Sequence, residues 1–429
     1  MTANTNPEKC VLAYSGGLDT SAIVPWLIEQ GYEVHAVLVD VGQAEDLQAL
    51  TAKAMTMGAT TAVVRDVRAD MAAGVLATQI GLGATYEGNY RLGTALARPF
   101  IALAQVERAH EIGATALAHG ATGKGNDQIR FEYAYRTLAP HCTIVAPWKT
   151  WEFQGRQDLV DYLESIGTPY AFEATKDLSM DENLWHLSVE GSHLEDPTAT
   201  LDVGVFLDAV KDRFHPGGPE NPGDATVSLT FEHGVPVALD GEPIALLDLV
   251  HTLNTQYRHA DWAWDLVLEN RFTGVKSRGL YINPAAKLLD VAIDALARAT
   301  MNKHAYDQYV ALGDQWAGLL YRGEYFTPQC QVVEQAATAS TQSLNGTITV
   351  RLAPQLHVQA IDADGLFREE LATFEASGYR HADANGFIAL NWLQSTGRAE
   401  PWSPIETPGK ESTHEHALEV RVAAASAVQ

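Results

Sequence analysis

A strand, a glycine turn and a helix follow one another near the start of the chain, and this order constrains the fold most. The stretch Tyr14–Ser21, YSGGLDTS, follows the apolar run 10–13 and precedes 22–30, which predicts a helix that ends at Gly31. Two glycines allow a tight turn close to a ligand, while hydroxyls and the amides at a helix start attract an anion. No lysine follows, so the stretch is not the GxxxxGK[ST] loop of common NTPases. We expect a phosphate site here, with an ordinary capped turn as the alternative.

Apolar runs and helical stretches alternate after this loop. Residues 34–40 form a near-continuous apolar run, which is typical of a strand buried on both faces of a parallel sheet. Residues 46–57 predict a helix and 61–64 a further strand. The alternation predicts a doubly wound α/β domain. Ligands of such sheets bind beyond the carboxyl ends of the strands, where we expect the first loop to lie.

A second glycine-rich loop follows another predicted strand. A helix predicted at 96–112 and a strand at 115–118 lead into His119–Glu132, HGATGKGNDQIRFE. Its three glycines let the backbone wrap closely, and Lys124 can neutralise phosphate. Polar side chains of both signs follow, as a zwitterionic amino acid requires: Thr122, Asn126, Asp127 and Arg130. A charged glycine loop is also a common solvated turn.

Composition argues against several classes of function. The formal net charge is −25 and no Lys/Arg run forms a basic groove, so nucleic acid is not an expected partner. No run of about 18 apolar residues predicts a membrane span, and the first residues carry no export signal. The three separated cysteines predict neither a disulfide nor a zinc site and favour the cytoplasm. The spacing of His119, His186 and His193 is not a metal-ligand pattern.

Several stretches together resemble the argininosuccinate synthase family. The first loop matches AYSGGLDTS, a form of the PP-loop of ATP pyrophosphatases, and the second matches HGATGKGNDQxRFE. Residues 86–99 match the segment that this family uses for its amino-acid substrate, while 179–191 and 269–281 resemble its SxDxNLWHxSxE and ENRxxGxKSRGxY motifs. The resemblance implies an enzyme that joins citrulline to aspartate with ATP, through a citrullyl-adenylate, and releases AMP and diphosphate. It also implies Mg²⁺ bound with ATP, and a homotetramer.

The resemblance also assigns residues to each substrate. No protein nucleophile is implied, so the catalytic residue stays open, with Lys124 as the electrostatic candidate. The positions implied for ATP are Ala13, Tyr14, Ser15, Gly16, Gly17, Leu18, Asp19, Thr20, Ser21, Val39, Ala118, His119, Gly120, Ala121, Thr122, Gly123, Lys124, Gly125 and Asn126. Those implied for citrulline are Tyr90, Ala95, Asn126, Arg130, Ser179, Ser188, Glu269 and Tyr281. Those implied for aspartate are Thr122, Asn126 and Asp127, and no residue is assigned to a metal.

The second half predicts an α+β domain. Strands are expected at 227–231, 235–238, 346–353 and 355–361, and helices at 244–257 and within 285–320. We expect a loop at 215–224 and a loosely held tail from Ala399 onward. The predicted boundaries are 1–168 for the nucleotide-binding domain, 169–370 for the amino-acid-binding synthetase domain, and 371–429 for a C-terminal oligomerisation segment with the tail.

Plainer interpretations of single residues stay open. Tyr90 and Tyr281 are also compatible with half-buried packing, Ser179 with a helix N-cap, and Glu269 with a surface ion pair to Arg271.

Four other functions have to be weighed against the pattern. The second half departs from the family at 263–265, 282–285 and 362–367, which leaves open a paralogue that couples aspartate to another ureido or amide compound. A tRNA-modifying PP-loop enzyme would want a basic surface and often paired cysteines, and the chain has neither. Intact polar residues in the motifs argue against a non-catalytic nucleotide-binding protein. The lack of an N-terminal catalytic cysteine or glutaminase segment argues against glutamine-dependent amide transfer.

Overall fold

The computed structural model describes residues 7–123, 125–173, 178–210, 225–366 and 380–396. The chain divides into two compact units, Met1–Phe367 and Arg368–Gln429, which we describe separately. The predicted loop 215–224, the tail from Ala399 onward and the side chain of Lys124 lie outside the described residues.

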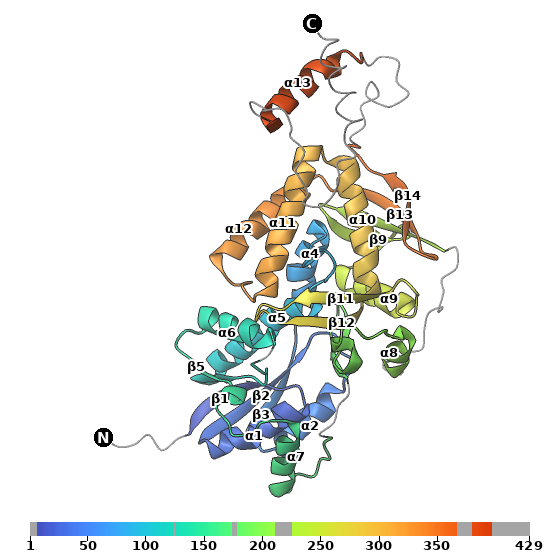
Figure 1. The fold of residues 1–429 in the computed structure, drawn as a ribbon. Coiled ribbons are helices and arrows are strands. Elements are labelled where there is room, and N and C mark those ends of the chain that lie inside the picture. Colours follow the sequence, from blue (N-terminus) through green and yellow to red (C-terminus); the bar gives the residue numbers. More distant parts are fainter. Residues whose placement is uncertain (1–6, 124, 174–177, 211–224, 367–379, 397–429) are drawn as a thin grey trace, which may run out of the picture. The chain divides into compact units, whose positions relative to one another are not determined.

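A five-stranded parallel sheet forms the lower part of the first unit in Figure 1. Its strand order is β3-β2-β1-β4-β5, so the order reverses beside β1, and the loops after β1 and β4 meet at this switch point. The strands are β1 Glu8–Ala13, β2 Tyr32–Asp40, β3 Thr61–Asp66, β4 Ala116–Ala118 and β5 Thr143–Val145.

Both faces of this sheet are covered, because neighbouring residues of one strand pack in different hydrophobic clusters. On β1, Cys10 and Leu12 pack with residues of the helices on one face, while Val11 packs with residues of the helices on the other. The helices of the first face are α1 Leu18–Glu29, α2 Leu47–Thr56 and α7 Arg156–Ser165; those of the second are α5 Gly93–Ile112 and α6 Asp127–Leu138. The predicted doubly wound α/β domain is confirmed.

Two antiparallel sheets follow. One has the order β10-β9-β8-β13-β14, and the other β11-β12-β7-β6. The first contains β8 Thr226–Glu232, β9 Val235–Leu239, β10 Glu242–Pro243, β13 Gly346–Arg351 and β14 His357–Asp362. All but the two-residue strand β10 correspond to strands predicted there. The second contains β6 Ser179–Glu182, β7 Leu187–Glu190, β11 Trp264–Asn270 and β12 Lys276–Ile282. The predicted second, α+β part is confirmed by this mixture of sheets and helices.

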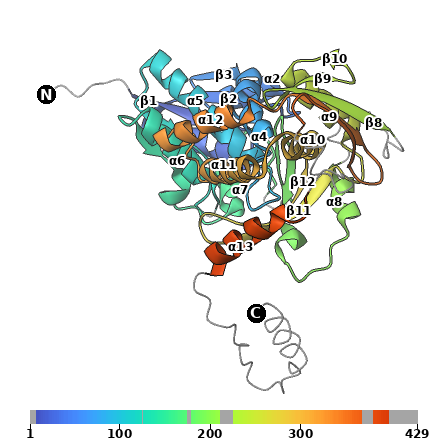
Figure 2. The ribbon, with the colours of Figure 1, turned by 90° about the horizontal axis from the view of Figure 1, so that it is seen from above.

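Several of the remaining helices of the first unit pack against one another although they are far apart in sequence. Figures 1 and 2 show α4 (Ala77–Leu82) among helices that come much later in the chain. It contacts α10 (Pro284–Thr300), α11 (Lys303–Tyr321) and α12 (Pro328–Thr341). The helices of the second part are α8 Val203–Val210, α9 Leu246–Tyr257, α10 Pro284–Thr300, α11 Lys303–Tyr321 and α12 Pro328–Thr341. The short helical segments are α3 Arg68–Met71, η1 Ala72–Leu76, α4 Ala77–Leu82, η2 Pro147–Lys149 and η3 Ser192–Glu195.

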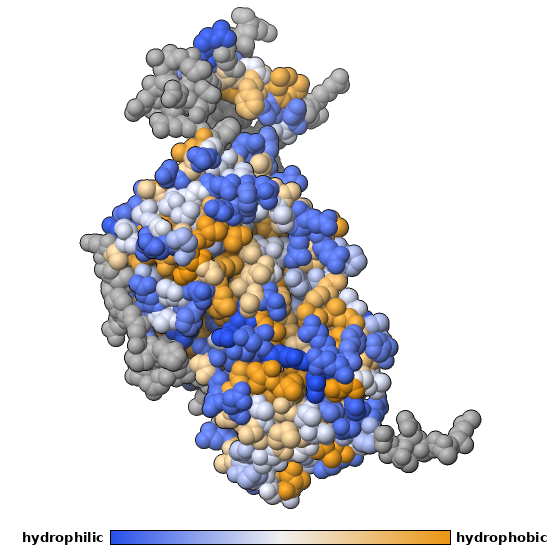
Figure 3. Space-filling model, turned by 180° about the vertical axis from the view of Figure 1, so that it is seen from behind, coloured by the Kyte–Doolittle hydropathy of each residue, from blue (hydrophilic) through white to orange (hydrophobic). Residues whose placement is uncertain are grey.

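Figure 3 shows hydrophilic and hydrophobic residues interspersed over one face. Among the described residues, none of the helices has the length and apolar character needed to cross a bilayer.

The second unit contains one described helix, α13 Asp383–Thr396. Its large apolar side chains are more than half exposed: Phe387, Ile388, Leu390, Trp392 and Leu393. An isolated helix with such a surface is typical of a segment that associates with another protein surface.

Candidate active site

A cavity of about 700 Å³ opens at the switch point of the parallel sheet. Residues of the loop after β1, the loop after β4, the start of α6, strands β6 and β7, and the β11–β12 hairpin all line it. The stretches quoted from the sequence therefore meet around one cavity, although they are separated by up to some 250 residues along the chain.

The loop after β1 has the geometry of an anion site. Gly16 has a φ of +75°, and a Cβ added there would lie 2.4 Å from a methyl carbon of Leu50, so only glycine fits. The backbone N–H groups of Ser15, Gly16 and Gly17 donate to no acceptor among the described residues, and no side chain caps α1. Successive unpaired N–H groups at a helix start bind phosphate well.

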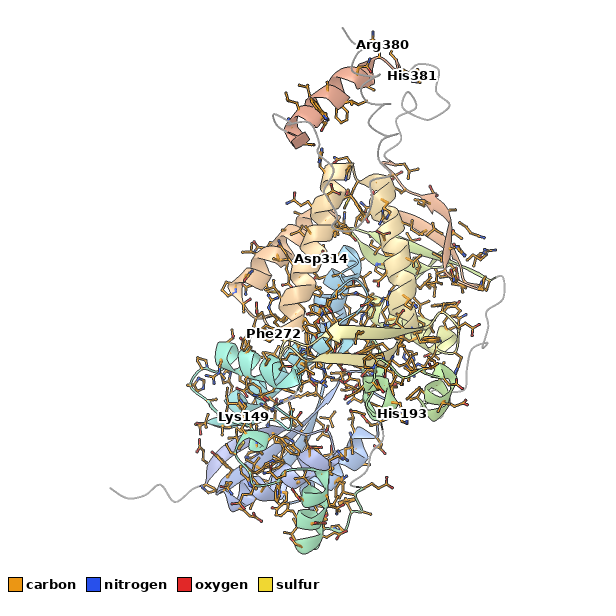
Figure 4. The ribbon with its side chains drawn as sticks, viewed as in Figure 1. Lys149, His193, Phe272, Asp314, Arg380 and His381 are labelled. Carbon is orange, nitrogen blue, oxygen red and sulfur yellow. The ribbon has the colours of Figure 1, made fainter. Side chains whose placement is uncertain are left out.

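The loop after β4 forms the second wall. A Cβ added at Gly120 would lie 3.1 Å from the methyl carbon of Thr20, so the two loops pack closely together. The Asn126 side chain accepts a hydrogen bond of 2.9 Å from the N–H of Phe272 in the β11–β12 turn, which is labelled in Figure 4. The later part of the chain thus fixes this loop.

Two guanidinium groups hold the carboxylate of Asp127. Arg98 Nε donates to Asp127 over 2.9 Å and Arg98 Nη2 to Asp181 over 2.6 Å, while Arg130 Nη1 donates to the other oxygen of Asp127 over 2.9 Å. Thr94 also donates to Asp181. Burial favours the neutral form of Asp127, but the two guanidinium groups outweigh it, and the net pKa of Asp127 is lowered. Asp127 is therefore an oriented anion.

Glu269 lines the same cavity, close enough to Arg130 for the guanidinium charge to act on its carboxyl. Its side chain is buried, and its Oε2 has no hydrogen-bond partner among the described residues. Burial, and secondly the nearby charge of Glu190, raise the pKa of Glu269 to about 7. Such a carboxyl lacks the donors that a ligand's N–H groups would supply.

Aromatic and charged side chains surround Glu269. The Tyr90 ring lies 5.0 Å from that of Tyr281 and 5.9 Å, edge-on, from that of Tyr321. Arg271 donates to Glu190 over 2.7 Å. Burial raises the pKa of Glu190, although Arg271 acts against this. The region combines apolar walls with groups of both signs.

The buried histidines beside the cavity have partners within the fold. His119 Nδ1 accepts a hydrogen bond from the Ala121 N–H, and the ring stacks on Phe131. His186 lies 3.3 Å from the hydroxyl of Thr94, and burial lowers its pKa to about 4, so its ring is neutral near pH 7. The described residues contain no group of three or more His, Cys, Asp or Glu arranged to hold a metal ion.

Comparison with protein families decides what kind of site this is. The model of the arginosuccinate synthase N-terminal HUP domain matches residues 9–169, and that of the arginosuccinate synthase C-terminal domain matches residues 178–397. The chain belongs to the argininosuccinate synthase family.

Individual relatives agree over nearly the whole length. The chain is 40% identical to the argininosuccinate synthase of Serratia proteamaculans, over 92% of this chain and 98% of the relative. It is 41% identical to that of Carboxydothermus hydrogenoformans, over 93% of this chain and 99% of the relative, and 41% identical to that of Photobacterium profundum, over 91% and 97%. Membership of this family makes the chain a ligase that uses ATP.

Most residues assigned from the argininosuccinate synthase pattern line the cavity. The ATP positions that do so are Ala13, Tyr14, Ser15, Gly16, Gly17, Asp19, Thr20, Val39, Gly120, Ala121, Thr122, Gly125 and Asn126. The amino-acid positions that do so are Tyr90, Thr122, Asn126, Asp127, Arg130, Ser179, Ser188 and Glu269. Their individual contacts with substrates stay predictions.

Other assigned residues do not line the cavity. Leu18, Ser21, Ala95, Ala118, His119 and Tyr281 are buried behind its surface, and Gly123 does not line it either. Ser21 supports the first loop, since its hydroxyl lies 3.2 Å from that of Tyr14. Two plainer interpretations are wrong: Ser179 begins strand β6 rather than a helix, and Glu269 is buried while Arg271 pairs with Glu190.

The assignment from the family pattern missed several polar residues of the cavity. They are Gln43, Glu45, Thr94, Arg98, Asp181, Glu182, Glu190 and Arg271. Gln43 and Glu45 lie outside the quoted motifs, whereas the other six lie within the stretches 86–99, 179–191 and 269–281. A polar or charged residue inside a motif was therefore the available signal for those six.

Proposed function

We propose that this chain joins citrulline to aspartate with ATP, through a citrullyl-adenylate, and releases argininosuccinate, AMP and diphosphate. The observation that carries the proposal is that one cavity combines an anion-binding loop with oriented side chains of both signs. Family membership supplies the reaction class, and the cavity supplies places for a polyphosphate and for two zwitterions.

The chemistry needs two displacements. The ureido oxygen of citrulline attacks the α-phosphorus of ATP, a P–O bond forms, and diphosphate leaves. The aspartate amine, once it has lost a proton, then attacks the activated carbon, and AMP leaves as the C–N bond forms. No protein nucleophile takes part, so the protein contributes mainly by orienting the reactants and stabilising charge.

The two ends of the cavity suit different groups. The loop after β1 would hold the phosphates through its unpaired N–H groups. Glu269, whose Oε2 lacks a partner, would accept hydrogen bonds from citrulline, and Arg130 would pair with a carboxylate. Asp127, oriented by two guanidinium groups, would receive the ammonium of aspartate.

Mg²⁺ would accompany ATP in this proposal. Seven carboxylates and three guanidinium groups line the cavity, so the cavity as a whole is acidic. Carboxylate oxygens are ligands that Mg²⁺ accepts, and Asp19 at the start of α1 is the one in the phosphate loop. Mg²⁺ would neutralise part of the phosphate charge there.

We also propose a homotetrameric, cytoplasmic enzyme with the domain boundaries given above. The exposed apolar residues of α13 support a role of segment 371–429 in assembly. Three cysteines without a disulfide and a net charge of −25 fit a cytoplasmic enzyme of small molecules.

Diphosphate release from ATP tests the reaction. The purified protein should release diphosphate only when citrulline and aspartate are both present, with argininosuccinate as the product. Release that depends on aspartate but needs another ureido compound would instead identify a paralogue. The absence of release under every condition would contradict the ligase assignment.

Two variants test the assignment of substrates to the cavity. Asp127→Ala should abolish ligation chiefly through aspartate, whereas Asp307→Ala, at an exposed position of α11, should leave it unchanged. Glu269→Ala should raise the KM for citrulline far more than that for ATP. An unchanged aspartate dependence in the first variant, or equal effects on both substrates in the second, would refute these roles.

A further inference from the structure

Lys53 reaches the phosphate loop from behind. It lies in the last turn of α2, and its Nζ donates a hydrogen bond of 2.8 Å to the backbone carbonyl of Gly16. Its ammonium also lies 4.3 Å from the ring centre of Phe172 and 5.2 Å from that of Tyr170. Lys53 does not line the cavity itself, so it acts on a ligand only through the loop.

The contact determines which way the next peptide points. A trans peptide holds its C=O and N–H in opposite directions. Fixing the Gly16 carbonyl towards Lys53 therefore turns the N–H of Gly17 away from it, and Gly16 and Gly17 both line the cavity. Because Gly16 and Gly17 have no side chains, neither residue can hold this peptide from the cavity side through a side chain of its own.

Within the described part of the chain, the ammonium of Lys53 lacks a carboxylate partner. No carboxylate lies within salt-bridge distance of its ammonium among the described residues, although the side chain is half-buried. Two aromatic faces and one carbonyl compensate only part of the lost hydration. Burial accordingly lowers the pKa of Lys53. An anion held on the other side of the loop would supply the missing negative charge.

We infer that Lys53 is a positioning residue for the polyphosphate of ATP: it orients the Gly16–Gly17 peptide and places a positive charge behind the loop. The inference rests on the proposed use of this loop for ATP and adds a residue that no family motif quoted above contains. A purely structural role would need only the hydrogen bond, and the hydroxyl of Ser21 already lies 3.4 Å from the same carbonyl.

Direct binding measurements distinguish a positioning role of Lys53 from a purely structural one. We would measure the dissociation constants of ATP, inorganic diphosphate and AMP by calorimetry, without either amino acid, for the wild type and for Lys53→Met and Lys53→Arg. Lys53→Met removes the charge at similar length and should weaken ATP and diphosphate about tenfold, the ratio that corresponds to about 1.4 kcal/mol. AMP, which lacks the β- and γ-phosphates, should change less than about threefold, and Lys53→Arg should restore most of the loss.

Lys303→Met is the matched control for Lys53→Met. Lys303→Met removes an exposed lysine that pairs with Asp307 and should leave all three constants unchanged. Unchanged binding of ATP and diphosphate by Lys53→Met would overturn the inference. So would an equal loss for all three ligands together with a lower unfolding midpoint, since that indicates damage to the fold. A wild type that binds ATP and diphosphate but forms no argininosuccinate would contradict only the proposed reaction.

Discussion

Replacing Glu269 by glutamine should make the stability of the unliganded protein less dependent on pH. The pKa of this carboxyl is raised from 4.5 to about 7 by burial and by Glu190. As pH rises, the unfolded chain loses this proton first, so the folded state binds more protons between the two values. The free energy of unfolding of the wild type therefore contains a favourable contribution at low pH that is lost as pH rises through about 7.

The structure gives the size of this contribution. One pKa unit corresponds to about 1.36 kcal/mol, so a shift of about 2.5 units costs the folded state about 3 kcal/mol once the carboxyl is ionised. The side chain is only 6% exposed, so solvent screening reduces this figure little. Most of it, about 2 to 3 kcal/mol, should develop between about pH 5 and about pH 8.

Chemical denaturation of the substrate-free protein across that pH range is the assay. Relative to the wild type, Glu269→Gln should gain stability steadily as pH rises, because glutamine mimics the protonated carboxyl at every pH. Glu107→Gln, on the exposed side of α5, is the control. Its free energy of unfolding should change with pH in the same way as that of the wild type. A difference between Glu269→Gln and the wild type that stays constant with pH would refute the reasoning.

Three further outcomes are expected. Citrulline binding near pH 7 should release up to about half a proton, because hydrogen-bond donors of the ligand stabilise the Glu269 carboxylate. Calorimetry in buffers of different ionisation enthalpy measures the released proton. A binding enthalpy that does not depend on the buffer would contradict this prediction. Arg98→Met should raise the KM for aspartate about tenfold or more and the KM for ATP less, because Asp127 loses one of its two guanidinium partners. Equal changes in the two KM values would indicate general damage to the fold. Gly16→Ala should abolish ATP binding, because the left-handed backbone and the side chain of Leu50 exclude a methyl group. Tight binding of ATP by this variant would contradict the loop geometry.

The local sequence pattern was sufficient to predict the strands and helices around the parallel sheet. The apolar run at 34–40 corresponds to β2, and the helix predicted at 96–112 corresponds to most of α5. In both cases the signal lies within a few consecutive residues: a strand buried on both faces must be apolar throughout, and a helix must end where Gly113 adopts a left-handed conformation.

The sheet of β6, β7, β11 and β12 could not be predicted in the same way. Strands β6 and β7 have only four residues each, too few for a clear apolar alternation, and β7 pairs with β12 about 90 residues away. The pairing of Arg98 with Asp181 likewise spans 83 residues. Motif spacing identified which stretches matter, but contacts over such separations follow from the tertiary fold.

The link between Arg98 and Asp181 has a consequence for how the chain is made. During synthesis the phosphate loop and the second loop leave the ribosome first. Of the two carboxylates that pair with Arg98 in the folded protein, only Asp127 has then been made. Strand β6 brings Asp181 later, and the β11–β12 turn, whose Phe272 amide fixes Asn126, comes later still. A growing chain can thus form its parallel sheet early, but it has no complete ligand cavity until the hairpin at 264–282 has emerged. The phosphate loop is therefore complete before the amino-acid pocket is, and a nascent chain should acquire ligation activity only after both are present.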